Sequence, residues 1–459
     1  MRALTEKVTE FAQNWIDGIA DAPATIAGDV DEMSEQIRRQ PPRDEPGSLE
    51  DALGTIAKAR DLAFNTAGPG FMAYIPGGGV YTAALGDYLA ASLNRYSGYW
   101  WASPVFAEIE WGLIRWMCEL FGYPEAASGA LTSGGSMANF SAVITARAAK
   151  LGEDFLKGTI YASDQAHHSV HKAAHMAGFP RDAVRVVPVD DQLRLELDAL
   201  SSTIAADKRA GAKPFLLVAS AGTTNTGAVD PLRDLRGVAD QNEMWLHADA
   251  AYGGFFQLTE RGSETLSGVE LADSITLDPH KGLFLPYGTG ALIVRNGDAL
   301  RNAHAVGEIA YLKDLPVARD FADYSSEMTR HMRSLRLWLP LTLHGVGAFR
   351  ETLDEKLDLA THLYNALDSR GDFDLPWEPS LSIVAFRHRS QGSQGIDTNK
   401  MLMKKINASQ RVLLSPTEID GVFWLRAAIL AHRTHRNRID ELVEIIDEAV
   451  SDMSRSLSP

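Results

Sequence analysis

A lysine, an aspartate and a glycine-rich turn are the residues of this sequence whose types and spacing favour chemistry. Lys281 follows a short apolar run, and Asp249 ends another such run 32 residues earlier. A desolvated lysine amine is a nucleophile, and a buried carboxylate needs a cationic or hydrogen-bonding partner. The turn at Gly135 and Ser136 precedes a predicted helix, so its N–H groups and the Ser136 hydroxyl predict an anion site.

Each of these features has an ordinary structural explanation when it is taken alone. A glycine-rich turn can simply begin a helix, a strand-end aspartate can cap a helix or form a salt bridge, and many strand-end lysines are solvated. Together and in this order, however, they match the phosphate, the ring nitrogen and the aldehyde of pyridoxal 5′-phosphate (PLP). The turn has neither a GxGxxG nor a GxxxxGK[ST] pattern, which disfavours dinucleotide and P-loop nucleotide binding.

Three apolar runs would position these side chains. The runs PFLLVASAG (214–222), MWLHADAAYGG (244–254) and SITLDPHKG (274–282) each begin apolar and end in polar or glycine residues. Buried strands of a mostly parallel sheet have this pattern, and ligands bind at the carboxyl ends of such strands. From about residue 80 to about residue 340 short apolar runs alternate with longer amphipathic stretches, which predicts an α/β fold.

The 459 residues are too many for a single core, and the pattern predicts three parts. Residues 1–75 form a helical segment, and residues 76–340 form a large PLP-binding domain with a mostly parallel central sheet. Residues 341–459 form a small α+β C-terminal domain, with strand candidates LSIVAFRH and GVFWLRAAIL and a final amphipathic helix, NRIDELVEIIDEAV.

Composition argues against several classes of protein. The net charge of −16 repels phosphate backbones, so we expect no nucleic-acid partner. Cys118 is the only cysteine, so no intrachain disulfide is possible and a reducing compartment is expected. The sequence has neither an uncharged apolar run of 18 residues nor a signal-peptide core at its N-terminus, so we expect no membrane association and a cytoplasmic location.

Four ordered motifs resemble the group II PLP-dependent decarboxylases, and in particular their aromatic-L-amino-acid decarboxylase branch. They are DQAHHSVHKA (164–173), HADAAYGG (247–254), DPHKG (278–282) and RSLRLW (333–338). The resemblance runs from about residue 65 to the C-terminus. It implies the PLP-dependent transferase fold of type I and a homodimer with shared active sites, in which the N-terminal segment packs on the partner subunit.

By this resemblance, Lys281 carries the cofactor as a Schiff base, Asp249 pairs with the protonated ring nitrogen and His167 stacks on the ring. Asp278 departs from the asparagine of the aromatic branch, and a carboxylate near a phosphate requires protonation or a water bridge. The further cofactor contacts that the resemblance implies are Gly135, Ser136, Thr224, Ala251, Asp278 and His280.

Tyr311 matches the tyrosine at which this family places its proton donor. It lies in residues 303–328, whose mixed polarity is typical of a loop that closes on substrate. Relatives that convert aromatic amino acids to aldehydes typically replace this tyrosine by phenylalanine, or the stacking histidine by asparagine. Because Tyr311 and His167 are both retained, simple decarboxylation is expected, and aldehyde formation stays open as an alternative.

The resemblance also implies a substrate pocket formed by GPGFMAYIPGGG (68–79) and, from the partner subunit, RYSGYWWASP (95–104). Its aromatic character favours tyrosine, tryptophan, DOPA or phenylalanine as substrate. Arg95 could pair with an acidic amino acid, which keeps aspartate and glutamate open. The glycines at 68, 70 and 77–79 depart from the family's bulkier residues and either widen the pocket or only alter the loop. The predicted pocket residues are Tyr74, Ile75, Pro76, Tyr96, Tyr99 and Trp101.

A histidine repeat offers a metal site as a competing interpretation. His167, His171 and His175 recur every four residues and would line one face of a helix. The stretch HKAAH lacks the glutamate of HExxH, and no cysteine pair or acidic cluster completes a site. We therefore expect no bound metal.

Overall fold

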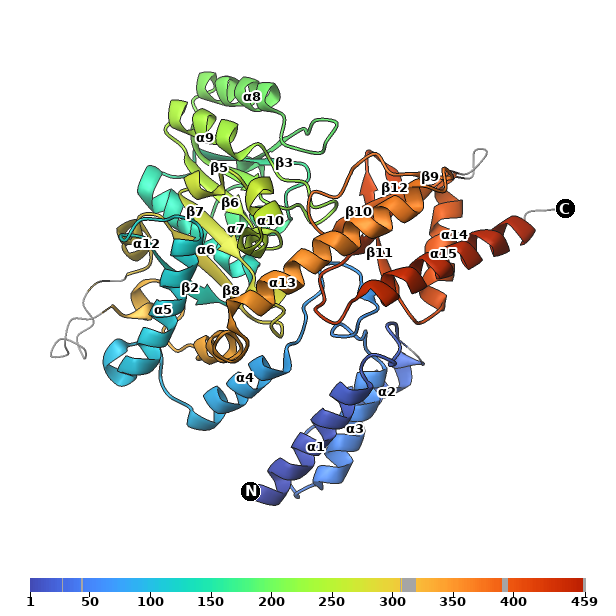
Figure 1. The fold of residues 1–459 in the computed structure, drawn as a ribbon. Helices are drawn as coiled ribbons and strands as arrows, with labels where there is room; N and C mark the ends of the chain where they lie inside the picture. Colours follow the sequence, from blue (N-terminus) through green and yellow to red (C-terminus); the bar gives the residue numbers. More distant parts are fainter. Residues whose placement is uncertain (27, 43, 306, 308–318, 390–394, 457–459) are drawn as a thin grey trace. The chain divides into compact units, whose positions relative to one another are not determined.

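The computed structural model describes residues 1–26, 28–42, 44–305, 307, 319–389 and 395–456. Contacts divide the chain into two compact units (Figure 1), which are described separately here. The large unit comprises residues 79–361 and 377–383, and the small unit comprises residues 1–78, 362–376 and 384–459.

A seven-stranded sheet forms the centre of the large unit, in the order β2-β8-β7-β6-β5-β3-β4. Only β8 runs against its neighbours, β2 and β7, and the remaining pairs are parallel. The predicted α/β fold with a mostly parallel sheet is confirmed. The strands are β2 (Ser128–Thr132), β3 (Gly158–Ser163), β4 (Val184–Val187), β5 (Lys213–Ser220), β6 (Trp245–Asp249), β7 (Ser274–Leu277) and β8 (Gly290–Val294).

Helices flank this sheet, and α6 contacts five of its strands, β2 and β5 to β8. Fully buried alanines at Ala138, Ala142 and Ala146 let α6 approach the sheet closely. In α13, Gly345 has a non-helical backbone with φ of 69°, which interrupts the helix. The helices are α4 (Tyr81–Leu93), α5 (Pro104–Leu120), α6 (Gly135–Lys150), α7 (Ser169–Met176), α8 (Leu197–Arg209), α9 (Leu232–Gln241), α10 (Glu260–Thr265), α11 (Pro279–Gly282), α12 (Gly297–His304) and α13 (Ser334–Asp368), whose last residues belong to the small unit.

The three predicted strands that end in polar residues are confirmed as β5, β6 and β7. They are consecutive neighbours, and their register aligns Ser220 with Asp249 and Asp249 with Thr276. Their carboxyl ends therefore meet at one edge of the sheet, where ligands of open α/β sheets bind. The short helix α11, which carries Lys281, follows β7 directly at this edge.

The small unit has a five-stranded sheet in the order β1-β11-β12-β10-β9. Its first strand pairs in parallel with β11, joining Phe71 to Leu413 across most of the chain length. The predicted helices near both termini are confirmed as α1, α3 and α15, and α2, capped by Asp29, is an additional helix. The elements are α1 (Arg2–Gly18), α2 (Val30–Arg38), α3 (Leu49–Asp61), β1 (Phe71–Met72), β9 (Phe373–Asp374), β10 (Ile383–His388), α14 (Gly395–Ala408), β11 (Leu413–Ile419), β12 (Val422–Ala428) and α15 (Arg436–Ser456).

The predicted boundaries at residues 75 and 340, and the docking of the first segment on a partner subunit, stay predictions. Among the helices of the described ranges, none combines the length and the hydropathy that a bilayer span requires.

Candidate active site

A polar cavity of about 260 Å³ lies at the carboxyl edge of the large unit's sheet. All nine residues predicted to contact the cofactor line it, although they come from five separate stretches of chain. The nine are Gly135, Ser136, His167, Thr224, Asp249, Ala251, Asp278, His280 and Lys281.

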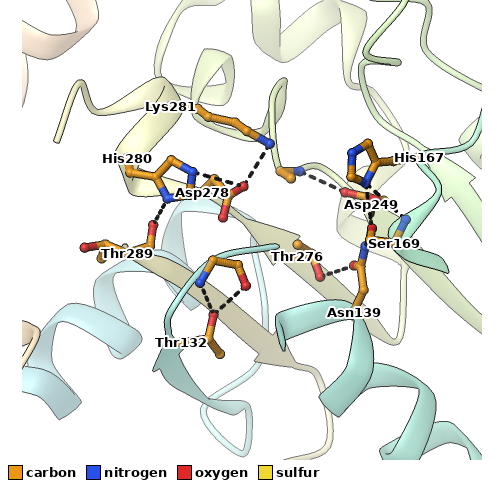
Figure 2. A network of polar contacts seen from close by, with 12 residues as sticks. Thr132, Asn139, His167, Ser169, Asp249, Thr276, Asp278, His280, Lys281 and Thr289 are labelled. Atoms are coloured by element: carbon orange, nitrogen blue, oxygen red, sulfur yellow. Dashed lines mark hydrogen bonds and ion pairs between the residues drawn. The ribbon is translucent and has the colours of Figure 1, made fainter. Parts of the chain in front are cut away.

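The glycine-rich turn between β2 and α6 forms one wall of the cavity. Gly134 has φ of 154°, and Thr132 holds it on both sides, accepting from its N–H at 3.3 Å and donating to its carbonyl oxygen at 3.0 Å (Figure 2). A Cβ atom at Gly135 would lie 2.9 Å from Asp278 Oδ2, so a larger residue there would force Asp278 to shift. The first amide groups of α6 have no partner within the helix, so together with the helix dipole they could hold an anion.

Asp278 and Lys281 face each other across the beginning of α11. Lys281 Nζ lies 2.9 Å from Asp278 Oδ2, and the aspartate side chain is 2% exposed. The other oxygen, Oδ1, is buried and has no hydrogen-bond partner within the described part of the chain. The cavity therefore contains a lysine amine held by a carboxylate that keeps one oxygen for a further contact.

His280 is held as a neutral ring. Its Nδ1 lies 2.7 Å from the Thr289 carbonyl oxygen, which can only accept, so Nδ1 carries the proton and Nε2 does not. Burial lowers the pKa of His280, although Asp278 opposes the effect, and the neutral form is favoured. The unprotonated Nε2 lies 3.7 Å from Asp278 Oδ2.

Asp249 is a buried carboxylate that is already held by two donors. Oδ2 accepts from Asn139 Nδ2 at 2.9 Å, and Oδ1 accepts from the Ala251 N–H at 3.2 Å. Hydrogen bonds of this kind stabilise the ionised form of a carboxyl group. Asp249 therefore presents a carboxyl group of fixed orientation to the cavity, where it could pair with a protonated nitrogen of a ligand.

Asn139 connects Asp249 to a chain of buried polar side chains. Because its Nδ2 donates to Asp249, its Oδ1 must accept, and it does so from Thr276 Oγ1 at 2.7 Å and from His247 Nε2 at 3.1 Å. Burial lowers the pKa of His247 to about 4, so the ring is neutral. Its single proton is on Nε2, because Nε2 donates to Asn139 Oδ1. We call Asn139, His247 and Thr276 with Asp249 the relay.

Two further hydrogen bonds extend the relay away from the cavity, and in each of them the donor is the group farther from Asp249. His247 Nδ1 lies 2.8 Å from Ser274 Oγ and accepts from it, while Ser274 Oγ accepts from Trp245 Nε1 at 2.8 Å. His247 and Ser274 are aligned in the register of β6 and β7, and side chains two residues apart on a strand share a face. Because side chains alternate between the two faces of β6 and β7, the residues of the relay lie on the face that α6 covers. The hydrogen bonds that link them to Asp249 all donate towards Asp249.

His167 lies in the turn between β3 and α7. Its Nδ1 accepts from the Ser169 hydroxyl at 2.7 Å, since Ser169 Oγ itself accepts from Asn139 Nδ2 at 2.9 Å (Figure 2). Burial lowers the pKa of His167, so the ring is neutral with its proton on Nε2. Because α7 begins only at Ser169, His167 does not share a helical face with His171 and His175, which the competing metal-site interpretation requires. Within the described ranges no group of three potential metal ligands occurs.

The predicted substrate residues do not line this cavity. Tyr96, Tyr99 and Trp101 lie in the large unit, where the Tyr96 and Tyr99 rings stack 5.9 Å apart and Trp101 follows 6.3 Å from Tyr99. Tyr74, Ile75 and Pro76 belong to the small unit. The predicted proton donor, Tyr311, lies outside the residues that the structure describes.

Several lining residues were missed by the sequence analysis, above all Asn139 and Ser169. Asn139 is a polar residue on the alanine-rich, fully buried face of a helix, and its position there was a usable signal. Ser169 follows His167 by two residues, a spacing that suits a side-chain contact in a turn. The other lining residues that were not predicted are Ser133, Gly134, Met137, Ser220, Gly222, Thr223 and Tyr252.

Pyridoxal phosphate fits the residues of this cavity. Lys281 offers an amine for an aldehyde, Asp249 offers a held carboxylate for a protonated ring nitrogen, and the α6 turn offers amide groups for a phosphate. The buried Asp278 Oδ1 has no partner in the described chain, so it can contact a polar atom of a ligand. Gly135 has no side chain and leaves space beside Asp278 for that ligand.

Comparison with known proteins also indicates a PLP-dependent enzyme. The profile of the pyridoxal-dependent decarboxylase conserved domain matches residues 34–389. An aromatic-L-amino-acid decarboxylase of Bacillus atrophaeus is 35% identical over 84% of this chain and 82% of its own. Among solved structures, the Oryza sativa TDC with PLP and tryptamine has a TM-score of 0.92 at 25% identity and covers 98% of both chains. The Catharanthus roseus tryptophan decarboxylase in complex with L-tryptophan has a TM-score of 0.91 at 26% identity, also over 98% of both chains.

The fold and the cavity define a PLP-dependent enzyme of fold type I. The chain belongs to the pyridoxal-dependent decarboxylase family. It is therefore a PLP-dependent amino-acid decarboxylase, as the motifs around His167, Asp249 and Lys281 predicted.

Proposed function

We propose that this enzyme decarboxylates an aromatic L-amino acid of the tyrosine, tryptophan, DOPA or phenylalanine type to the amine and CO₂. The observation that carries this proposal is the aromatic cluster of Tyr96, Tyr99 and Trp101, in which Tyr96 stacks on Tyr99 and Trp101 is tilted against Tyr99; such a cluster suits an aromatic side chain. Relatives named as tyrosine decarboxylase and tryptophan decarboxylase 2, both from Oryza sativa, support it at 29% identity each.

Three residues of the cavity would carry the cofactor. Lys281 would attach it through Nζ, the Asp249 carboxylate would hold a proton at the ring nitrogen, and the neutral His167 ring would pack against the ring face. The bound cofactor supplies an electron sink for the bond between Cα and the carboxylate carbon of the substrate. Asn139 and the Ala251 N–H hold the Asp249 carboxyl group in position, because both donate to its oxygens.

Tyr311 would return a proton to Cα of the product. This role separates the proposed reaction from its runner-up, aldehyde formation, which a phenylacetaldehyde synthase of Arabidopsis thaliana, 28% identical, represents among the relatives. In air-saturated buffer we expect Tyr311→Phe to lower amine yield and to raise aldehyde, ammonia and peroxide, with one O₂ consumed as the oxidant for each aldehyde formed. An unchanged amine yield in this variant would remove Tyr311 from the proposal.

The acidic alternative depends on Arg95, which is exposed. An exposed arginine is well solvated and provides little selectivity, so this alternative has less support than the aromatic one. Arg95→Ala should leave the rate with an aromatic substrate unchanged, whereas a loss of aspartate or glutamate turnover in this variant would favour the acidic substrate.

We further propose a homodimer in which the two subunits share their active sites. Four large apolar side chains of α4 are exposed at helical spacing, from 38% for Leu85 to 55% for Tyr88. An exposed stripe of this kind marks a protein interface, and a second copy of this chain is the partner that shared sites require. Leu89→Glu should give a monomer in sedimentation equilibrium, and a dimer in this variant would contradict the role of α4. The stripe is Leu85, Tyr88, Leu89 and Leu93.

A substrate panel tests the proposed function directly. CO₂ and amine should form in equal amounts from L-tyrosine, L-tryptophan, L-DOPA or L-phenylalanine, and not from L-aspartate, L-glutamate or L-histidine. Turnover of only the acidic amino acids would refute the aromatic proposal. In the control variant Lys281→Ala, borohydride should no longer fix the cofactor to the chain, while reduction of the wild type should do so at this lysine.

A further inference from the structure

We propose that Asp278 takes up a proton when pyridoxal phosphate binds, and that its protonated carboxyl group donates a hydrogen bond to the phosphate of the cofactor. The proposal depends on the family's cofactor and not on the aromatic substrate proposed above. It gives this buried aspartate a defined role in holding the cofactor.

The position of Asp278 provides the first argument. Its side chain is 2% exposed and lies against the glycine-rich turn, so close that a Cβ at Gly135 would come within 2.9 Å of Oδ2. The same turn is the anion site of the cavity. A phosphate bound there would therefore have Asp278 as a neighbour, with no room for a layer of water between Oδ2 and the Gly135 backbone.

The charges around Asp278 provide the second argument. Lys281 Nζ, 2.9 Å away, is the cation in contact with it within the described chain. His280 and His167 also face it, and burial lowers the pKa of both rings, so neither supplies a positive charge at neutral pH. From α13, Arg336 is engaged by Thr289 Oγ1 at 2.9 Å and by Asp87, and Asp249 on β6 adds a second negative charge to the cavity.

Cofactor binding would change the hydrogen-bond donors that Lys281 offers to Asp278. Attachment of the cofactor aldehyde at Nζ would leave at most one N–H on Lys281, because the other two hydrogens of the ammonium group would leave with the aldehyde oxygen as water. Asp278 thereby loses donors at the moment when a doubly charged phosphate enters the neighbouring turn. A carboxylate and a phosphate dianion side by side disfavour joint ionisation, and because the amide groups and the helix dipole of α6 stabilise the charge of the phosphate, the buried carboxyl group takes up the proton.

The unpartnered oxygen provides the third argument. Asp278 Oδ1 is buried and has no hydrogen-bond partner in the described chain, which is costly for an ionised oxygen. A proton on the carboxyl group turns it into a donor for a phosphate oxygen. The proton comes from solvent, and no other bond changes.

The first test compares cofactor affinity in the wild type and in Asp278→Asn, whose amide donates without a proton being taken up. We expect the ratio of the PLP dissociation constants, wild type over variant, to rise about tenfold per pH unit between pH 6.5 and pH 8.5, because only the wild type must bind a proton. The measurement is a fluorescence titration of each apoenzyme. A ratio that stays constant over this range would overturn the proposal.

Two controls separate the phosphate contact from other effects. Pyridoxal bonds to Lys281 in the same way but lacks the phosphate, so its ratio should not change with pH; an equal rise for pyridoxal would assign the effect to Lys281 and overturn the proposal. Asp191→Asn, an exposed position, makes the same change in net charge and should bind PLP like the wild type.

A second measurement needs no variant. Calorimetric titration of the wild-type apoenzyme at pH 8, in buffers of different ionisation enthalpy, should show about one more proton taken up per PLP than per pyridoxal. The ³¹P resonance of the bound cofactor should be that of the dianion, which places the proton on the protein. A monoanion resonance, or equal proton uptake with both aldehydes, would refute the role of Asp278.

Discussion

Asn139→Asp tests the direction of the relay beneath the active site. The substitution removes the Nδ2 donor and places a carboxyl oxygen 2.9 Å from Asp249 Oδ2. Two ionised carboxyl groups at this separation repel each other by about 6 kcal/mol at an effective dielectric constant of about 20. We therefore expect the new carboxyl group to keep its proton in the folded apoenzyme at neutral pH and to donate to Asp249 in place of the amide.

This proton makes the stability of the variant depend on pH. The pKa of the new carboxyl group is raised in the folded state, so the folded protein binds one proton that the unfolded chain has released above about pH 4. Stability is therefore lost as the pH rises, by about 1.4 kcal/mol per pH unit. Relative to the wild type, the free energy of unfolding should fall by about 3 kcal/mol between pH 5 and pH 7.

Urea unfolding of the apoenzymes at pH 5, 6 and 7 measures this difference, since only groups of the chain then titrate. Asn139→Leu is the matched control, because it removes the same hydrogen bonds without adding a titratable group. Its stability deficit should be the same at each pH. If the deficit of Asn139→Asp were equally independent of pH, Asn139 would not donate to Asp249 and the direction of the relay would be wrong.

Three further results are expected. Gly135→Ala would bring a Cβ to 2.9 Å from Asp278 Oδ2, so the dissociation constant of PLP in a fluorescence titration should rise about tenfold, and an unchanged constant would argue against the turn as phosphate site. Burial lowers the pKa of His247 from its usual 6.5 to about 4, so the folded state binds fewer protons and the free energy of unfolding should fall by about 3 kcal/mol as the pH drops through this window. Urea unfolding checks this, and a loss of the same size in His247→Asn would contradict it. Ser169→Ala removes the donor to His167 Nδ1 and should lower kcat for CO₂ release about five- to thirtyfold at unchanged PLP content, whereas a wild-type kcat would show that the ring needs no such support.

The sequence predicted those parts of the site that follow from local patterns. Apolar runs that end in polar residues identified β5, β6 and β7, and the glycine-rich turn together with Asp249 and Lys281, in that order along the chain, indicated the cofactor. The glycine-rich turn before α6 was predicted for the same reason, since a helix beginning requires little long-range information.

Features that depend on contacts between distant elements could not be predicted. The relay needs α6 to lie over β6 and β7, and nothing near Asn139 in the sequence identifies Asp249 or His247 as its partners. The pairing of Phe71 with Leu413 joins strands from opposite ends of the chain. The spacing of His167 to the next histidines suits one face of a helix, but α7 begins only at Ser169, so His167 lies in the turn before it.

The hydrogen bonds of the relay also couple the substitutions that its residues can accept. Asn139, His247 and Thr276 come from three elements, and each donates or accepts in the only direction that its partners allow. A single replacement at one of these positions leaves two donors or two acceptors facing each other in a dry interior. We therefore expect substitutions there to be tolerated in pairs and rejected singly. In a library that randomises the three positions together, the residues found in functional variants should covary strongly. The relay then constrains sequence change as strongly as the residues that contact the cofactor.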